Sequence, residues 1–232
     1  MKDYNTVRLV IGLLVVFIAV VIFLNHTVLK KTKKIDAKFM TRSAIFGAMA
    51  TLLYIIPIFN ISLPFFPEFL KVHIDEVPLL IAGFAYGPLS AILGLTVKTL
   101  IKLPMTFTMG VGELADFIYS FVFIIVSSLI YKKHRNMKGA LVALLLGTIA
   151  QIVAASFITT FLILDFYMQV VGLPEFVIMA QIKAAGIKID NLRWPFLFAV
   201  GIPFNAFKDF FVVLFTLLLY KRLHHFVERV SK

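Results

Sequence analysis

Cysteine is absent from this 232-residue chain, and charged residues make up only 15% of it. The lack of cysteine excludes disulfide bonds, thiolate metal sites and a cysteine nucleophile. With five histidines and no His-Glu-x-x-His pattern, a zinc centre is not expected. The shortage of charge excludes a water-soluble enzyme, because soluble domains carry about 25% charged residues and a small domain keeps much of its surface wet.

Hydrophobic residues, by contrast, make up 61% of the chain, and its mean hydropathy is +0.98. A membrane-spanning helix needs roughly 20 apolar residues. The apolar runs cover 7–24, 40–58, 72–86, 88–102, 110–131, 138–164 and 196–220. They predict an all-α polytopic membrane protein in which one extra N-terminal transmembrane helix precedes a six-helix core. The expected division is 1–35, the extra helix with a basic linker, and 36–232, the six-helix domain.

The positive charge is distributed as in a membrane protein. The formal net charge is +11, and the lysines and arginines gather at 30–42, 132–138 and 221–232, between or after apolar runs. Such clusters mark cytoplasmic segments, whereas a nucleic-acid-binding face is not expected. The pattern predicts a cell-membrane protein with a cytoplasmic C-terminus, and it places 59–71, 103–109 and 165–195 outside.

Two polar residues near the start of the last predicted span, Asn205 and Lys208, are three positions apart and share a helix face. Ionisable groups inside a membrane are costly unless they are paired or hydrated, so each one marks a candidate site. An amide and an ammonium could bind the edge of a heterocyclic ligand rich in carbonyls. The alternative is an ion pair of Lys208 with Asp209 or Glu113 that only holds helices together.

Glu113 and Asp116 open the span at 110–131 and also share a face. Carboxylates in a first turn are favoured by the helix dipole and by capping, so these two residues either cap the helix or contact a ligand.

Asp75 and Glu76 lie at the start of another helix, where we expect them to act as capping residues. His73 with Asp75 supplies too few ligands for a metal site. Lys98 lies deeper in its span than Lys102 and is expected to pair with Asp75 or Glu76.

Taken together, these elements resemble the substrate-binding S component of energy-coupling-factor (ECF) vitamin transporters, most closely the riboflavin-specific branch. The resemblance spans about 38–225. Its matching stretches are FLKV at 69–72, IDEVP at 74–78, YGPL at 86–89, VK at 97–98, GVGELA at 110–115, and IPFN at 202–205 with Lys208.

The resemblance implies a prokaryotic uptake function and no enzymatic activity. Such a protein captures its vitamin from outside, without a cofactor of its own. It then docks on a transmembrane coupling subunit driven by two ATPase subunits. Docking uses small residues of the first core helix, here Ala44 and Ala48, which form a small-xxx-small pattern that lets helices approach closely.

The resemblance also implies a ligand site. Asn205 and Lys208 fall on positions that contact the flavin ring system, and Glu113 is a further candidate. The family places asparagines where this chain has Asp116 and Thr159. The difference at Asp116 matters because an ionised aspartate accepts hydrogen bonds but donates none. The outer loop contributes Leu63 and Phe65, which suit a flat aromatic ligand.

Other functions remain open from the sequence alone. The cargo could be riboflavin, FMN or another water-soluble vitamin. A phosphorylated cargo would require positive residues at the outer mouth, and the candidates are Lys71, Lys102, Lys183, Lys188 and Arg193. A solitary ion-coupled carrier would use Asp116, Glu113 or Asp209 as its ion site. An intramembrane enzyme is not expected, because the sequence contains no catalytic motif. A structural partner of another membrane complex would bind no small ligand.

Overall fold

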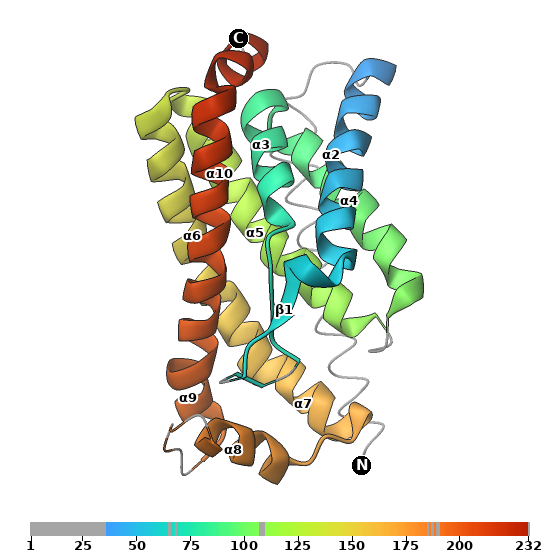
Figure 1. The fold of residues 1–232 in the computed structure, drawn as a ribbon, viewed down its shortest axis with the longest axis vertical. Coiled ribbons are helices and arrows are strands. Elements are labelled where there is room, and N and C mark those ends of the chain that lie inside the picture. The colour runs from blue at the N-terminus through green and yellow to red at the C-terminus, as the bar shows by residue number, and fades with distance from the viewer. Residues whose placement is uncertain are drawn as a thin grey trace.

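The computed structural model describes residues 36–231 except 65, 68, 107–109, 185, 187 and 189–190. The predicted extra helix at 7–24 therefore lies outside the described residues, and the division at residue 35 stays a prediction. The described chain forms a bundle of helices along the long axis of the molecule (Figure 1). The C-terminus lies at one end of this bundle, and the short helices α8 and α9 lie at the other.

Among the described residues, six longer helices build the bundle: α2 (Ala37–Ile55), α3 (Glu76–Tyr86), α4 (Pro88–Lys102), α5 (Val111–Lys133), α6 (Met137–Ile158) and α10 (Ile202–Ser231). Shorter pieces complete it: 3-10 turns at Pro57–Phe59 and Leu103–Met105, π-helical stretches at Thr159–Ile163, Tyr167–Val171 and Leu197–Gly201, and α7 (Leu164–Phe166), α8 (Glu175–Ala184) and α9 (Arg193–Phe196). The π-helical stretches continue α6 into α7 and α9 into α10, so these two helices are longer than their α-helical parts.

Local chemistry accounts for several helix ends. The side chains of Asp36 and Asn136 cap α2 and α6 by accepting hydrogen bonds, at 2.7 and 2.8 Å, from the backbone N–H three residues on. Gly87, at φ 90°, separates α3 from α4, and Pro88 then takes the first position of α4. Gly110 makes the corresponding left-handed turn before α5 at φ 83°.

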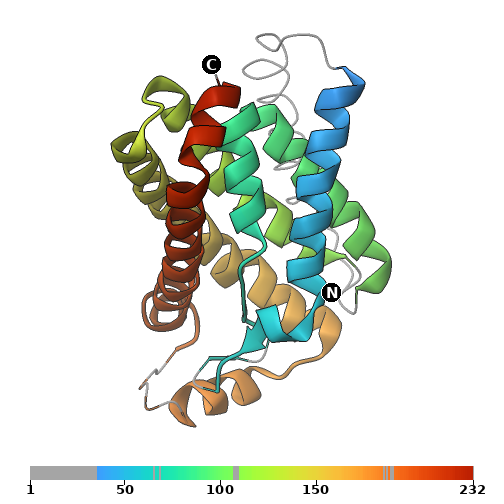
Figure 2. The same cartoon turned by 45° about the horizontal axis from the view of Figure 1, so that its top comes forward.

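The first outer loop contains a two-stranded antiparallel hairpin, β1 (Asn60–Ser62) and β2 (Lys71–His73), with Asn60 opposite His73. The prediction of a span beginning at residue 72 was wrong at this end, because strand pairing holds 71–73 in an extended conformation and α3 begins only at Glu76. The predicted outer loop at 165–195 is also largely helical. Figure 2 shows the hairpin close to the segment that carries α7 and α8.

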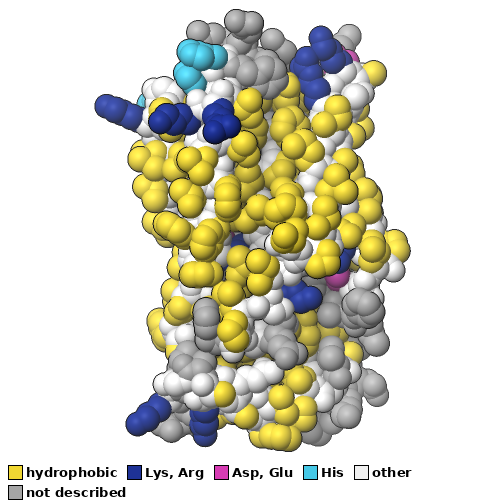
Figure 3. Space-filling view, viewed as in Figure 1, with side chains coloured by type: hydrophobic (Ala, Val, Ile, Leu, Met, Phe, Trp, Pro, Cys, Tyr) yellow, Lys and Arg dark blue, Asp and Glu magenta, His cyan; other side chains and the backbone are white. Residues whose placement is uncertain are grey.

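The surface of the bundle is that of a membrane protein. Hydrophobic side chains cover much of its middle, and lysines and arginines gather at the end where α10 finishes (Figure 3). Within the described residues, four segments are long and apolar enough to cross a membrane: Pro88–Met105, Val111–Lys133, Met137–Val170 and Arg193–His225. Glu76–Tyr86 is apolar but shorter. The predicted number of six core spans plus one stays a prediction.

Helices α2 and α4 cross at a contact made by small residues. A Cβ on Gly47 would lie 2.7 Å from the carbonyl oxygen of Gly94, and the hydroxyls of Ser43 and Ser90 are hydrogen-bonded at 2.9 Å. These residues repeat every four positions on both helices, which is the spacing that lets two backbones approach. Because this stripe faces inward, Ala44 and Ala48 are exposed on another side of α2.

Candidate ligand-binding site

A cavity of about 310 Å³ lies between the hairpin, the adjoining ends of α2 and α4, the start of α5, the π-helical continuation of α6, and the start of α10. Cavities that hold small molecules begin at roughly this size. Among the residues proposed from the sequence, Glu113, Asp116, Thr159, Asn205 and Lys208 line it. Leu63 is half-buried in the outer loop but is not one of the lining residues, and Phe65 lies outside the described residues.

One wall of the cavity is held by a fully buried lysine of α4. Lys98 is 1% exposed; its Nζ donates to the carboxylate of Asp75 and, at 2.7 Å, to Oδ2 of Asp116. The predicted pairing of Lys98 with Asp75 is therefore confirmed. The expectation that Asp75 caps α3 through its side chain was wrong, because no cap hydrogen bond forms and the carboxylate turns to Lys98.

A second buried ion pair lies beside the first. Lys208 Nζ donates to Oε1 of Glu76 at 2.5 Å and lies 3.9 Å from Asp209. In the amide orientation that satisfies its neighbours, the Gln151 oxygen accepts from Lys208 at 3.1 Å and its nitrogen donates to Asp209 at 3.2 Å. Glu76 is thus the counter-ion of Lys208 rather than a capping residue, and it was not among the partners we considered for Lys208.

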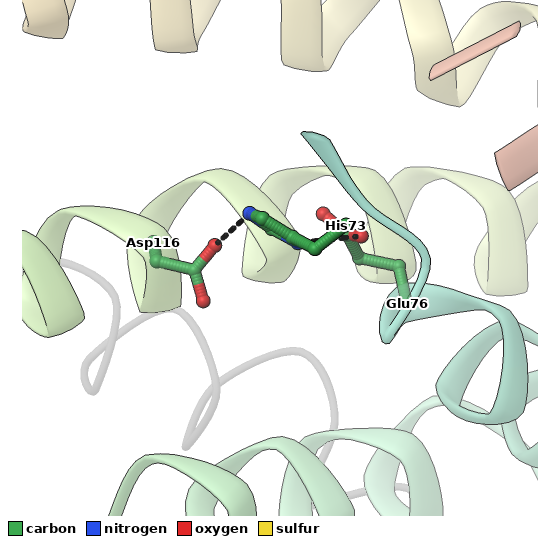
Figure 4. A group of neighbouring side chains, drawn as sticks. All are labelled: His73, Glu76 and Asp116. Atoms are coloured by element: carbon green, nitrogen blue, oxygen red, sulfur yellow. Dashed lines mark ion pairs between the residues drawn. The ribbon is translucent and has the colours of Figure 1, made fainter. Parts of the chain in front are cut away.

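His73 links these two ion pairs. Its Nδ1 contacts the Asp75 carboxylate and lies 3.6 Å from Glu76 Oε2, while its Nε2 lies 3.5 Å from Asp116 Oδ1 (Figure 4). Burial lowers the pKa of His73, whereas the Asp75 carboxylate and hydrogen bonds to Asp75 and Glu76 raise it. The raising effects together are larger, and the net result is a pKa of about 9. The imidazole is therefore positively charged at neutral pH.

The same three groups have the composition of a metal site, since ligating atoms of His73, Glu76 and Asp116 lie within 4.8 Å of one another. A protonated imidazole has no free lone pair for a metal, and the ammonium of Lys98 already sits 2.7 Å from Asp116. The cluster therefore fits a neutralised ion network better than a metal ion.

Asn205 and Thr159 present polar groups to the cavity from buried positions. The Asn205 side-chain nitrogen donates to the Gly201 carbonyl at 2.8 Å and to Ser156 Oγ at 3.2 Å. Among the described residues no group donates to its side-chain oxygen, which leaves an acceptor for a ligand. The Thr159 hydroxyl is hydrogen-bonded at 3.0 Å to Tyr119, another lining residue.

Glu113 is half-buried on the cavity wall, where it accepts a hydrogen bond at 2.5 Å from the hydroxyl of Thr106. Gly110 occupies the capping position at the start of α5 and supplies no side-chain cap hydrogen bond.

Several aromatic residues that line the cavity were missed in the sequence. Tyr167 stacks on Phe69 of the outer loop with ring centroids 4.6 Å apart, and the Tyr54 ring lies 4.8 Å from Lys98 Nζ. Phe204 meets Phe66 edge-on at 5.2 Å. In a chain with 25 phenylalanines, no sequence signal separates these residues from core aromatics. Their placement gives the cavity flat apolar surfaces beside its polar groups.

Comparison with known proteins identifies the family of the chain. A family model described as the substrate-specific component of ECF transporters matches residues 38–220. The chain belongs to this family. The S component is 26% identical over 200 residues to the riboflavin transporter RibU of Staphylococcus aureus (strain TCH60), covering 85% of this chain and 98% of that protein. It is 27% identical over 184 residues to the riboflavin transporter FmnP of Bacillus subtilis (strain 168), covering 78% and 90%.

The fold agrees as well. A solved structure of the S component of a bacterial ECF transporter superposes with a TM-score of 0.62 and 26% identity, covering 82% of this chain and 97% of that chain. An S component is the substrate-specific subunit of a transporter and not an enzyme. This S component is a multi-pass membrane protein.

Proposed function

We propose that this S component captures riboflavin from outside the cell and delivers it inward when docked on a transmembrane coupling subunit with two ATPases. The observation that carries the cargo assignment is the joint position of Asn205 and Lys208 on the wall of a cavity of about 310 Å³. The two relatives that are named riboflavin transporters support it.

The chemistry of the cavity suits a flavin. One edge of the flavin ring system carries two carbonyl oxygens with an N–H between them. The ammonium of Lys208 can donate to a carbonyl, and the free oxygen of Asn205 or the carboxylate of Asp116 can accept from the N–H. Tyr54, Phe69 and other aromatic side chains along the cavity provide surfaces on which a flat ring can stack.

The proposed orientation follows the charges at the two ends. Exposed Lys221 and Arg222 on α10, together with Lys132 and Lys133 at the end of α5, lie at the end of the bundle away from the hairpin. Positive charge marks the cytoplasmic side of a bacterial membrane protein. The C-terminus is therefore proposed to be cytoplasmic, and the cavity opens to the outside.

A solitary ion-coupled carrier is less well supported. It would require a carboxylate that is free to exchange a proton or sodium ion. Asp116 is hydrogen-bonded to Lys98 at 2.7 Å, Glu113 to Thr106 at 2.5 Å, and Asp209 lies 3.9 Å from Lys208. Uptake by the isolated chain in proteoliposomes, without ATPase subunits, would support the carrier and contradict the proposal.

Flavin binding is tested on the protein purified in detergent. We expect a flavin absorption spectrum, and heat release followed by chromatography should give riboflavin. If the purified protein is colourless, titration with riboflavin should quench the flavin fluorescence. A protein that neither carries a flavin nor responds to added riboflavin contradicts the cargo assignment.

Docking is tested on the exposed small residues of α2. We expect Ala44→Trp and Ala48→Trp to abolish riboflavin uptake by cells while leaving binding by the purified protein unchanged. A bulky side chain keeps a partner helix away, but at an exposed position it displaces nothing inside the fold. Leu145→Trp, at a 52% exposed position on α6, is the matched control. Normal uptake in both alanine variants would remove this face from the docking proposal.

A further inference from the structure

Four buried charges form a closed ring beside the cavity. His73 and Lys98 each contact both Asp75 and Asp116, so cations and carboxylates alternate around the ring. The Lys98 ammonium lies 2.7 Å from Oδ2 of Asp116, and His73 Nε2 lies 3.5 Å from Oδ1 of the same carboxylate. None of the four side chains is more than 10% exposed. The members of the ring therefore depend on one another, rather than on water, for neutralisation.

The geometry of the His73 imidazole requires a proton on both of its nitrogens. Nδ1 contacts Asp75 and lies 3.6 Å from Glu76, whereas Nε2 faces Asp116 (Figure 4). A neutral imidazole has a single N–H, so its other nitrogen would point a lone pair at a carboxylate. Burial lowers the pKa of His73 and the Asp75 carboxylate raises it, and the resulting value of about 9 agrees with this geometry.

His73 is also the member of the ring that belongs to the outer hairpin. It ends β2, opposite Asn60 of β1, and both residues line the cavity. The other three members lie at the start of α3, on α4 and on α5. The contact of His73 with Asp116 therefore joins the hairpin to a helix that is distant in the chain. Loss of the imidazolium charge would break this contact, while Lys98 would still hold Asp75 and Asp116 together.

We infer that His73 is a positioning residue whose positive charge holds the outer hairpin over the cavity, so that retention of a bound ligand depends on a doubly protonated imidazole. A second attachment of the hairpin is apolar. Leu70, next to β2, belongs to one buried cluster with Ile178 and Ile182 of α8. Loss of the charge should therefore loosen the hairpin on the side of α5 without unfolding it.

The effect of pH on this contact has a defined sign. Because the pKa of His73 is raised above its ordinary value of 6.5, the contact is complete below about pH 6.5 and is lost as the pH rises through about 9. Other titratable or charged groups face the imidazole from the helices packed around it. They are Tyr54 of α2, Asp75 and Glu76 at the start of α3, Lys98 of α4, Asp116 of α5, and Lys208 and Asp209 of α10.

The first measurement is the rate at which the purified protein releases riboflavin, which rests on the proposed function and is followed by recovery of flavin fluorescence. The rate of His73→Gln is divided by that of the parent at each pH, which removes ionisation of the ligand from the comparison. We expect a ratio of about ten at about pH 7.5, the effect of losing one hydrogen bond to a charged group, and a fall toward about one at about pH 10. His134→Gln, at an exposed histidine between α5 and α6, is the control and should give a ratio of about one throughout.

The second measurement requires no ligand. Because the chain has no cysteine, Ser62→Cys on the hairpin and Leu145→Cys on α6, both at exposed positions, provide unique sites for a pair of spin labels. In the ligand-free protein we expect a narrow distribution of label-to-label distances at about pH 7.5. The distribution should become broader at about pH 10, and it should be broad at both pH values in His73→Gln.

A release ratio that is the same at both pH values overturns the inference, as does a distance distribution that does not change with pH in the parent. A fall in the Tm of His73→Gln as large as that of Lys98→Met also overturns it, since His73 would then hold the core rather than the hairpin. Failure to bind riboflavin contradicts the proposed function, and the spin-label distances then test the role of His73 alone.

Discussion

Lys208→Met is expected to weaken riboflavin binding by at least about a hundredfold. The ammonium of Lys208 lines the cavity and donates to Glu76 at 2.5 Å, so the substitution removes a charged donor and also leaves a buried carboxylate without its counter-ion. A hydrogen bond from a charged donor contributes about 1.5–3 kcal/mol, and in the variant a flavin carbonyl would also meet the unpaired Glu76 carboxylate; every 1.4 kcal/mol, roughly, is a factor of ten in affinity. Quenching of flavin fluorescence during titration measures the loss.

A double variant separates binding from folding. In Lys208→Met with Glu76→Gln, both charges are gone, so thermal stability should return toward that of the parent while binding stays weak. Asn205→Ala should have a smaller effect on affinity, because it removes neutral hydrogen bonds. If Lys208→Met binds riboflavin as tightly as the parent, Lys208 is not part of the ligand site.

Lys98→Met is expected to be the most damaging change for stability. Lys98 is the cation between Asp75 and Asp116. Without it, His73 is the remaining cationic neighbour of these two buried carboxylates. The expected loss of about 3–5 kcal/mol corresponds to a fall in Tm of about 10 °C for a chain of this length. Thermal unfolding of the purified protein in detergent, followed by size-exclusion chromatography, measures it.

Lys102→Met is the matched control for stability, since it lies one helical turn further along α4 and has no carboxylate partner among the described residues. Its Tm should stay within a few degrees of the parent. Equal loss of Tm in the two variants would mean that the ion network around Lys98 contributes no more than a surface charge.

The sequence predicts those helix boundaries that are determined by residues adjacent in the chain. The helix that begins at Pro88 could be predicted because Gly87 and Pro88 are adjacent and stop one helix while starting the next. The hairpin could not be predicted, because β1 and β2 are three residues each and depend on pairing between distant segments. The extended conformation of Lys71–His73 is therefore a product of the fold and not of local propensity.

The ion network shows the same limit. One partner of Lys98, Asp75, was predicted, whereas the other, Asp116, was missed although it is closer to Lys98 in the chain. The partner of Lys208 was missed because Glu76 lies 132 residues away and belongs to the opposite half of the sequence. Spacing on one helix identifies residues that share a face, as it did for Asn205 and Lys208, but it does not identify the side chain that faces them.

The glycine crossing of α2 and α4 has a mechanical consequence. The backbone of Gly47 packs directly against Gly94, so the two helices are in close contact and a movement of one displaces the other. Helix α4 also carries Lys98, which holds a wall of the cavity. If a partner protein binds the outer face of α2 and moves this helix, α4 would move with it. The cavity wall that Lys98 holds would then be displaced relative to a bound ligand.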